Sequence, residues 1–290
     1  MHNTRSIIRQ TRTLAATALA TLLLLPGTGW AASTLDEVRE SGVVRIGFAN
    51  ESPFGYATPQ GELTGEAPEV AKVVLARMGI DNVEAVLMPF RSLVPALQAR
   101  RFDMIAAGMF VTPARCEQVL FSEPTFSVGQ AMIVKSDNPQ DIHGYSDFVE
   151  NSSLKLGVVG GGQAHKYARE IGISDDQISV FADGPSGRAA VEAGRINAWA
   201  MTSLAIQRLL DSAGDAKVER AEPFEASSTD TRGHGAFAFH RDDGEFRDAF
   251  NTALKEFIGT PEHRELVRPF GFTEEEAPMM TTEQLCADAP

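Results

Sequence analysis

Cysteine is scarce in this 290-residue sequence, which contains only Cys116 and Cys286. Two thiols cannot build a disulfide-dense scaffold or a four-thiolate metal site. None of the six histidines forms a His-x₃-His pair, and the sequence has no His-Glu-x-x-His, Cys-x-x-Cys or EF-hand pattern. It also lacks the Gly-x-Ser-x-Gly elbow of serine hydrolases. We therefore expect no metal and no cofactor.

Basic residues and long apolar runs are also in short supply. The chain has 26 basic and 39 acidic residues, for a formal net charge of −13. Three of the basic residues and none of the acids lie within positions 1–31, so the rest of the chain carries −16. This charge argues against a nucleic-acid partner or an anionic membrane surface. The apolar run at residues 14–25 is about 12 residues long, whereas a membrane-spanning helix needs about 20.

That apolar run is the central part of an N-terminal targeting signal. Arg5, Arg9 and Arg12 precede it, and Gly29-Trp30-Ala31 places small residues at positions −3 and −1 of a cleavage site. This order predicts a secretory signal peptide over residues 1–31, rather than the alternative, a membrane anchor. We expect a soluble mature chain in the bacterial periplasm.

An oxidising compartment makes a disulfide between Cys116 and Cys286 plausible, and such a bond would tie down the C-terminal tail. The alternative is two unpaired thiols, one of them buried under a helix. Sequence alone does not give the geometry that decides between them.

Short strands and helices alternate along the chain in two series, which indicates mostly parallel α/β sheets. We predict strands at residues 43–48, 83–88, 103–107, 154–159, 178–181 and 196–201. We predict helices at residues 35–40 (capped by Thr34), 68–78, 163–171, 185–193, 204–210 and 246–258.

Two extended apolar runs, at residues 131–134 and 235–239, connect the two series. They predict an α/β fold of two lobes with a two-strand hinge. The first lobe is expected at 32–133 plus 238–290, and the second at 134–237. A cleft between lobes favours a small-molecule ligand, over which the hinge closes. The alternative is two rigidly packed domains without a functional hinge.

Two local patterns suggest anion binding. Thr112-Pro113 begins a helix with Arg115 in its first turn, where a cation opposes the helix dipole unless an anion binds there. The alternative is a solvated surface arginine. The glycines at 160–162 follow a strand and open a helix, so their N–H groups suit an anion. The alternative is a turn that only lets the strand and helix pack closely.

The segment at 97–124 resembles the signature of family 3 periplasmic solute-binding proteins, the polar amino-acid receptors of ABC importers. The matching residues are Leu97, Asp103, Thr112, Pro113, Arg115, Phe121, Ser122 and Pro124. This resemblance implies a type II periplasmic-binding-protein fold with a ligand cleft between its lobes. It also implies a monomeric, non-enzymatic receptor that delivers its ligand to permease subunits at the inner membrane. Arg115 would then clamp a ligand carboxylate, assisted by backbone N–H groups near Gly108 and Thr112.

Three positions depart from the amino-acid receptors. Phe110 stands where a serine or threonine is usual, and Gln163 follows the glycine turn where a small hydroxyl residue is usual. Thr202 occupies the usual place of an aspartate that pairs with the ligand's α-ammonium group. A buried ammonium without that partner is costly.

Phe54, Phe90 and Phe110 fall on loops expected to face the cleft, with Glu51 three residues before Phe54. Aromatic faces attract a weakly hydrated cation, which Glu51 would pair with. Arg115, Glu51 and the three rings therefore suit a cyclic zwitterion, and this set resembles the ectoine- and hydroxyectoine-binding members of the family. For the rings, ordinary core packing is the alternative. For the function, the alternatives are a polar amino-acid receptor and a secreted enzyme resembling cyclohexadienyl dehydratase, with Glu51 as its acid.

Overall fold

The computed structural model describes residues 33–212, 217–225 and 232–287. The predicted signal peptide at 1–31 lies outside these residues and stays a prediction. Within the described ranges, no helix is both long enough and apolar enough to cross a membrane.

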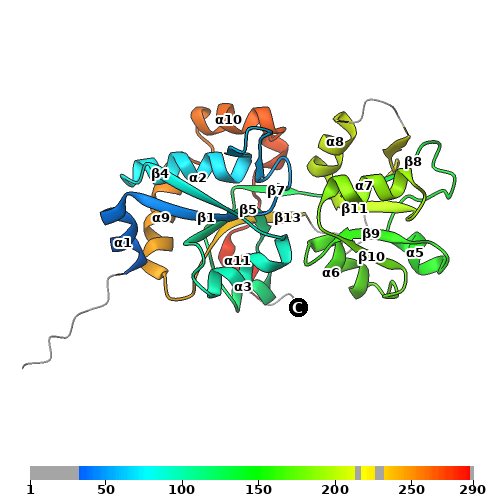
Figure 1. The fold of residues 1–290 in the computed structure, drawn as a ribbon, viewed down its shortest axis with the longest axis horizontal. Helices are drawn as coiled ribbons and strands as arrows, with labels where there is room; N and C mark the ends of the chain where they lie inside the picture. The colour runs from blue at the N-terminus through cyan, green and yellow to red at the C-terminus, as the bar shows by residue number, and fades with distance from the viewer. Residues whose placement is uncertain (1–32, 213–216, 226–231, 288–290) are drawn as a thin grey trace, which may run out of the picture. The chain divides into compact units, whose positions relative to one another are not determined.

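The first sheet has the strand order β4-β1-β5-β13-β6, and β7 also pairs with β13 (Figure 1). β4, β1 and β5 are parallel, whereas β13 runs antiparallel to β5, β6 and β7. Val44 on β1 lies opposite Val83, and Ile46 lies opposite Met104. The strands are β1 (Val43–Phe48), β4 (Asn82–Leu87), β5 (Met104–Phe110), β6 (Leu120–Phe121), β7 (Phe126–Val128) and β13 (Gly233–Phe239).

The second sheet repeats this arrangement with the order β10-β9-β11-β8-β12. Its antiparallel strand β8 follows strand β7 of the first sheet in the chain. In the same way, β13 of the first sheet follows strand β12 of the second sheet. The strands are β8 (Gln130–Lys135), β9 (Leu156–Val159), β10 (Ile178–Phe181), β11 (Ala198–Thr202) and β12 (Val218–Arg220). A separate short hairpin joins β2 (Tyr56–Ala57) and β3 (Leu63–Thr64). The prediction of two α/β units is confirmed.

Helices pack against each sheet, and their apolar sides form the buried clusters of the core. Around the first sheet lie α1 (Thr34–Ser41), α2 (Glu66–Arg77), η1 (Phe90–Ser92), α3 (Leu93–Gln98), α4 (Pro113–Cys116), α9 (Gly244–Phe257), α10 (Pro261–Val267), η2 (Arg268–Phe270), η3 (Glu274–Glu276) and α11 (Thr282–Cys286). Around the second lie α5 (Ser146–Glu150), α6 (Gln163–Glu170), α7 (Gly184–Glu192) and α8 (Ser203–Asp211).

Several predicted boundaries shift because contacts distant in sequence decide where an element ends. The strand predicted at 103–107 continues to Phe110, since Met109 and Phe110 pair with β13. The cap of α1 is Ser33 rather than Thr34, because the Ser33 and Asp36 side chains form a capping box.

The predicted lobe limits at 133/134 and 237/238 fall inside strands. Among the described residues, β8 pairs only with strands of the second sheet, and β13 only with strands of the first. By sheet membership, one crossing therefore lies near Gly129 and the other before Gly233. Each of the two apolar runs predicted to form the hinge lies within a sheet strand.

Candidate ligand-binding site

The site forms where parallel strands of the two sheets end. β1 leads to Glu51, β4 leads to Phe90, and β5 ends at Phe110. In the second sheet, β9 leads to the glycine turn at 160–162 and β11 ends at Thr202. Ligands of α/β sheets typically bind outside the carboxyl ends of parallel strands, and this topology brings the predicted residues together there.

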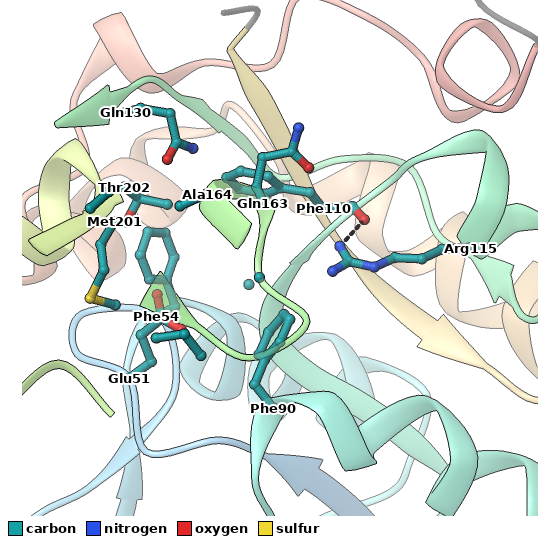
Figure 2. Close-up of a pocket in the computed structure, with 14 residues that line it drawn as sticks. Glu51, Phe54, Phe90, Phe110, Arg115, Gln130, Gln163, Ala164, Met201 and Thr202 are labelled. Carbon is teal, nitrogen blue, oxygen red and sulfur yellow. Dashed lines mark hydrogen bonds between the residues drawn. The ribbon is translucent and has the colours of Figure 1, made fainter. Parts of the chain in front are cut away.

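Fourteen residues from both sheets line a cavity of about 50 Å³ (Figure 2). A water molecule needs about 10–15 Å³ of such space, so the cavity favours a small ligand. Thr112 is the one predicted site residue outside the lining. The lining residues are Glu51, Phe54, Phe90, Gly108, Phe110, Arg115, Gln130, Val159, Gly162, Gln163, Ala164, Ala200, Met201 and Thr202.

Arg115 is the basic residue of this lining. As predicted, a helix begins at Thr112-Pro113: Thr112 occupies the N-cap position of α4 without a side-chain capping bond, and Pro113 lies in the first turn. The guanidinium donates to the Phe110 carbonyl at 2.8 Å and to the Gly161 carbonyl at 3.0 Å, so it bridges the two sheets. Its Cζ lies 5.5 Å from the centre of the Phe90 ring. Burial lowers the Arg115 pKa to about 10, and the group stays charged at neutral pH.

Glu51 is the acidic residue of the lining, and Figure 2 shows it across the cavity from Arg115. Its loop follows β1 and is closed by backbone hydrogen bonds between Glu51 and Gly55. Burial raises the Glu51 pKa to about 7, because desolvation penalises the carboxylate. A bound cation would lower that pKa again and hold the carboxylate ionised.

The three phenylalanines line the cavity, but two of them are also core residues. Phe54 and Phe110 are 2% and 5% exposed. Both pack against Phe126, with ring centres 5.1 Å and 6.4 Å apart, and Phe54 also contacts Phe272 at 5.7 Å. Core packing and cavity lining are therefore not alternatives here, because each ring does both.

The second sheet contributes buried polar atoms without partners. Gln130 Nε2, Gln163 Oε1 and Thr202 Oγ1 have no hydrogen-bond partner among the described residues, and all three residues line the cavity. Buried polar groups are normally paired, so these atoms favour a polar ligand in the cavity. Gln130 was missed in the sequence because it lies at the start of an apolar strand. A polar residue at a strand end facing the cleft was the available signal.

The remaining lining residues of the second sheet were also missed. These are Val159, Ala164, Ala200 and Met201, which are apolar. They carry no chemical signature in the sequence, and only the approach of the two sheets places them at the cavity.

The glycine turn at 160–162 serves close packing rather than anion binding. Its three N–H groups already donate, to Phe181 O, His165 Nδ1 and Val159 O. A Cβ at Gly161 would come within 3.3 Å of the Arg91 backbone, and its φ is +77°. These N–H groups are therefore not free for an anion; the turn lets the sheets approach, offers Arg115 a carbonyl and places Gly162 at the cavity.

Cys116 and Cys286 form a disulfide with Cα atoms 5.7 Å apart, which ties α11 to α4. The bond anchors the residue next to Arg115 and closes a separation of 170 residues. Elsewhere in the described ranges, no group of three or more His, Cys, Asp or Glu side chains is placed to hold a metal ion.

Comparisons with known proteins agree with this geometry. Residues 44–273 match the family model of bacterial extracellular solute-binding proteins, family 3. The probable amino-acid ABC transporter periplasmic-binding protein y4tE of Sinorhizobium fredii is 36% identical over 283 residues, 95% of this chain and 93% of the relative.

Two solved structures are similar over most of the chain. EhuB in complex with hydroxyectoine has 34% identity and a TM-score of 0.83, covering 88% of this chain and 98% of that chain. The ancestral amino acid-binding protein AncCDT-1, a precursor of cyclohexadienyl dehydratase, has 27% identity and a TM-score of 0.71, covering 82% and 99%. The two-sheet architecture is thus a type II periplasmic-binding-protein fold, and this chain belongs to the family 3 extracellular solute-binding proteins of ABC importers.

Proposed function

We propose that this protein captures ectoine or hydroxyectoine in the periplasm and delivers it to the permease subunits of an ABC importer. The observation that carries the proposal is the charge pattern of the cavity. Arg115 and Glu51 are its two charged lining residues, and aromatic rings lie between them. A ligand with one carboxylate and one delocalised cation on a small ring matches this pattern.

The second sheet favours this ligand over a free α-amino acid. Its contribution to the lining is neutral, with Thr202 where amino-acid receptors usually have an acid. Ectoine spreads its positive charge over an amidinium, which can stack on phenylalanine faces while Glu51 balances it. The hydroxyectoine complex of EhuB supports the same ligand class.

Two other functions have specific support. The relative y4tE is named as a probable amino-acid receptor, which favours a polar amino-acid ligand. The raised pKa of Glu51, at about 7, would suit a general acid, which favours a dehydratase-like activity. The binding relatives argue for a receptor rather than an enzyme.

Isothermal titration calorimetry of purified protein with ectoine, hydroxyectoine, glycine betaine, proline, glutamine and arginine tests the proposal. We expect tight binding of ectoine or hydroxyectoine, at least about 100-fold tighter than of the amino acids. Preferred binding of glutamine or arginine would establish the amino-acid alternative. Appreciable conversion of prephenate to phenylpyruvate would establish the enzyme.

A further inference from the structure

A second cavity, of about 320 Å³, lies beside the first sheet and shares no lining residue with the first cavity. It is bounded by the start of α2, by α10 and η2, and by residues 272–278. Phe126 and Phe272 form part of its wall and also pack on Phe54, which lines the first cavity. The aromatic cluster therefore separates two distinct spaces.

Two deeply buried polar side chains line this second cavity with unpaired atoms. Glu66 is 1% exposed and His263 is 8% exposed. Glu66 Oε1 accepts from Thr125 Oγ1 at 2.7 Å, whereas Oε2 has no partner within the described part of the chain. His263 Nδ1 accepts from the Gly259 N–H at 3.3 Å, and His263 Nε2 has no partner there either.

His263 Nε2 is a hydrogen-bond donor, and Glu66 Oε2 is a donor when its carboxyl group is protonated. Since His263 Nδ1 accepts a hydrogen bond, the proton of the neutral ring resides on Nε2. Burial lowers the pKa of His263 and keeps the ring neutral. Burial also raises the Glu66 pKa to about 8, although the bond from Thr125 opposes the shift. Glu66 is then mostly protonated at pH 7, with its proton on Oε2.

The rest of the lining does not favour an ion. Val267, Phe126, Phe272 and Ile258 supply apolar surface. The charges at the lining have both signs: Arg264, Arg268 and Glu274 are exposed, and Glu276 is half-buried. Mostly apolar walls with a few converging polar groups are typical of small-molecule sites.

We propose that this cavity is a second small-molecule site, which takes a neutral, largely apolar molecule whose carbonyl oxygen accepts hydrogen bonds from His263 and Glu66. An apolar cavity of about 150 Å³ is known to bind benzene, so the volume here admits one substituted ring. This site is independent of the proposed capture of ectoine.

The test is an NMR titration of isotope-labelled protein at pH 7 with acetophenone, and with ethylbenzene as the matched probe that lacks the carbonyl. We expect saturable shifts of amides around the cavity, at Gly259 and Val267. His263→Phe should lower the affinity for acetophenone relative to ethylbenzene by about three- to tenfold, and His263→Gln should restore most of it.

A cavity-filling pair of variants keeps the proposal falsifiable if a His263 variant folds poorly. Ala277 is an exposed lining residue, whereas Met279 is exposed and outside the lining. Ala277→Trp should abolish the acetophenone shifts, and Met279→Trp should retain them. Ectoine titrations of the same variants should be unchanged. Absence of saturable shifts, or shifts that survive Ala277→Trp, would show that the cavity holds only water and overturn the proposal.

Discussion

The two sheets have the same strand order, yet they contribute different chemistry to the first cavity. Both charged lining residues, Glu51 and Arg115, and all three phenylalanines follow strands of the first sheet. The second sheet provides neutral side chains, including the unpaired polar atoms of Gln130, Gln163 and Thr202.

This difference suggests that the two lobes have different roles in ligand binding. The first lobe would hold the ligand's ionic groups, and the second would exclude water and complete the hydrogen bonds on closure. Excluding water strengthens an ionic contact because the local dielectric falls. Variants in the first lobe should therefore cost far more affinity than those in the second.

The largest loss is expected for Arg115→Ala, which should weaken ectoine binding by at least about 100-fold in calorimetry. A charged hydrogen-bonding partner of the ligand is removed from a buried site. Arg115→Lys is the matched control. It keeps the positive charge but loses the planar guanidinium with its paired N–H donors, so this variant should bind ectoine with intermediate affinity. Unchanged affinity in Arg115→Ala would remove Arg115 from the site.

The next loss is expected for Phe110→Ala, by more than about tenfold, because a ring that faces the ligand's cation is removed. Phe110 is also buried, so the melting temperature must be measured alongside affinity. Phe110→Leu preserves most of the packing without the aromatic face. Full affinity in Phe110→Leu would assign the ring to packing alone.

The pH dependence of ectoine affinity should report the protonation of Glu51. Its pKa of about 7 in the unliganded protein must fall when a cation binds, so binding releases a proton below pH 7. Affinity should be constant above about pH 8 and decrease roughly tenfold per pH unit below about pH 6. Burial lowers the pKa of His165, near the glycine turn, so its titration is displaced away from that of Glu51. Glu51→Gln should abolish the dependence; a profile that keeps its slope in that variant would implicate another group.

The smallest effect is expected in the second lobe. Thr202→Val replaces the unpaired hydroxyl with a methyl group of similar shape and should cost about two- to fivefold in affinity. Ser203→Ala, outside the lining, is the control and should leave affinity unchanged. If Thr202→Val cost as much as Arg115→Ala, the proposed division between the lobes would be wrong.

Much of the fold and site was predictable because it depends on local patterns. The alternation of apolar runs and turns indicated both α/β series, and Thr112-Pro113 marked the helix that carries Arg115. The predicted lobe limits fall inside β8 and β13, because these strands are apolar whether they cross between lobes or complete a sheet. Thr112 was predicted at the site but occupies the N-cap position of α4, outside the cavity lining.

By itself, the sequence determined which residue types follow each strand, and therefore that one arginine, one glutamate and three phenylalanines meet at the strand ends. Tertiary structure decided how those residues are used. It made Phe54 and Phe110 both core and lining, occupied the N–H groups of the glycine turn, and left buried polar atoms of Glu66 and His263 unpaired within the described residues. The physical reason is that a hydrogen bond or a ring contact depends on segments far apart in sequence, whose approach is set by the packing of both sheets.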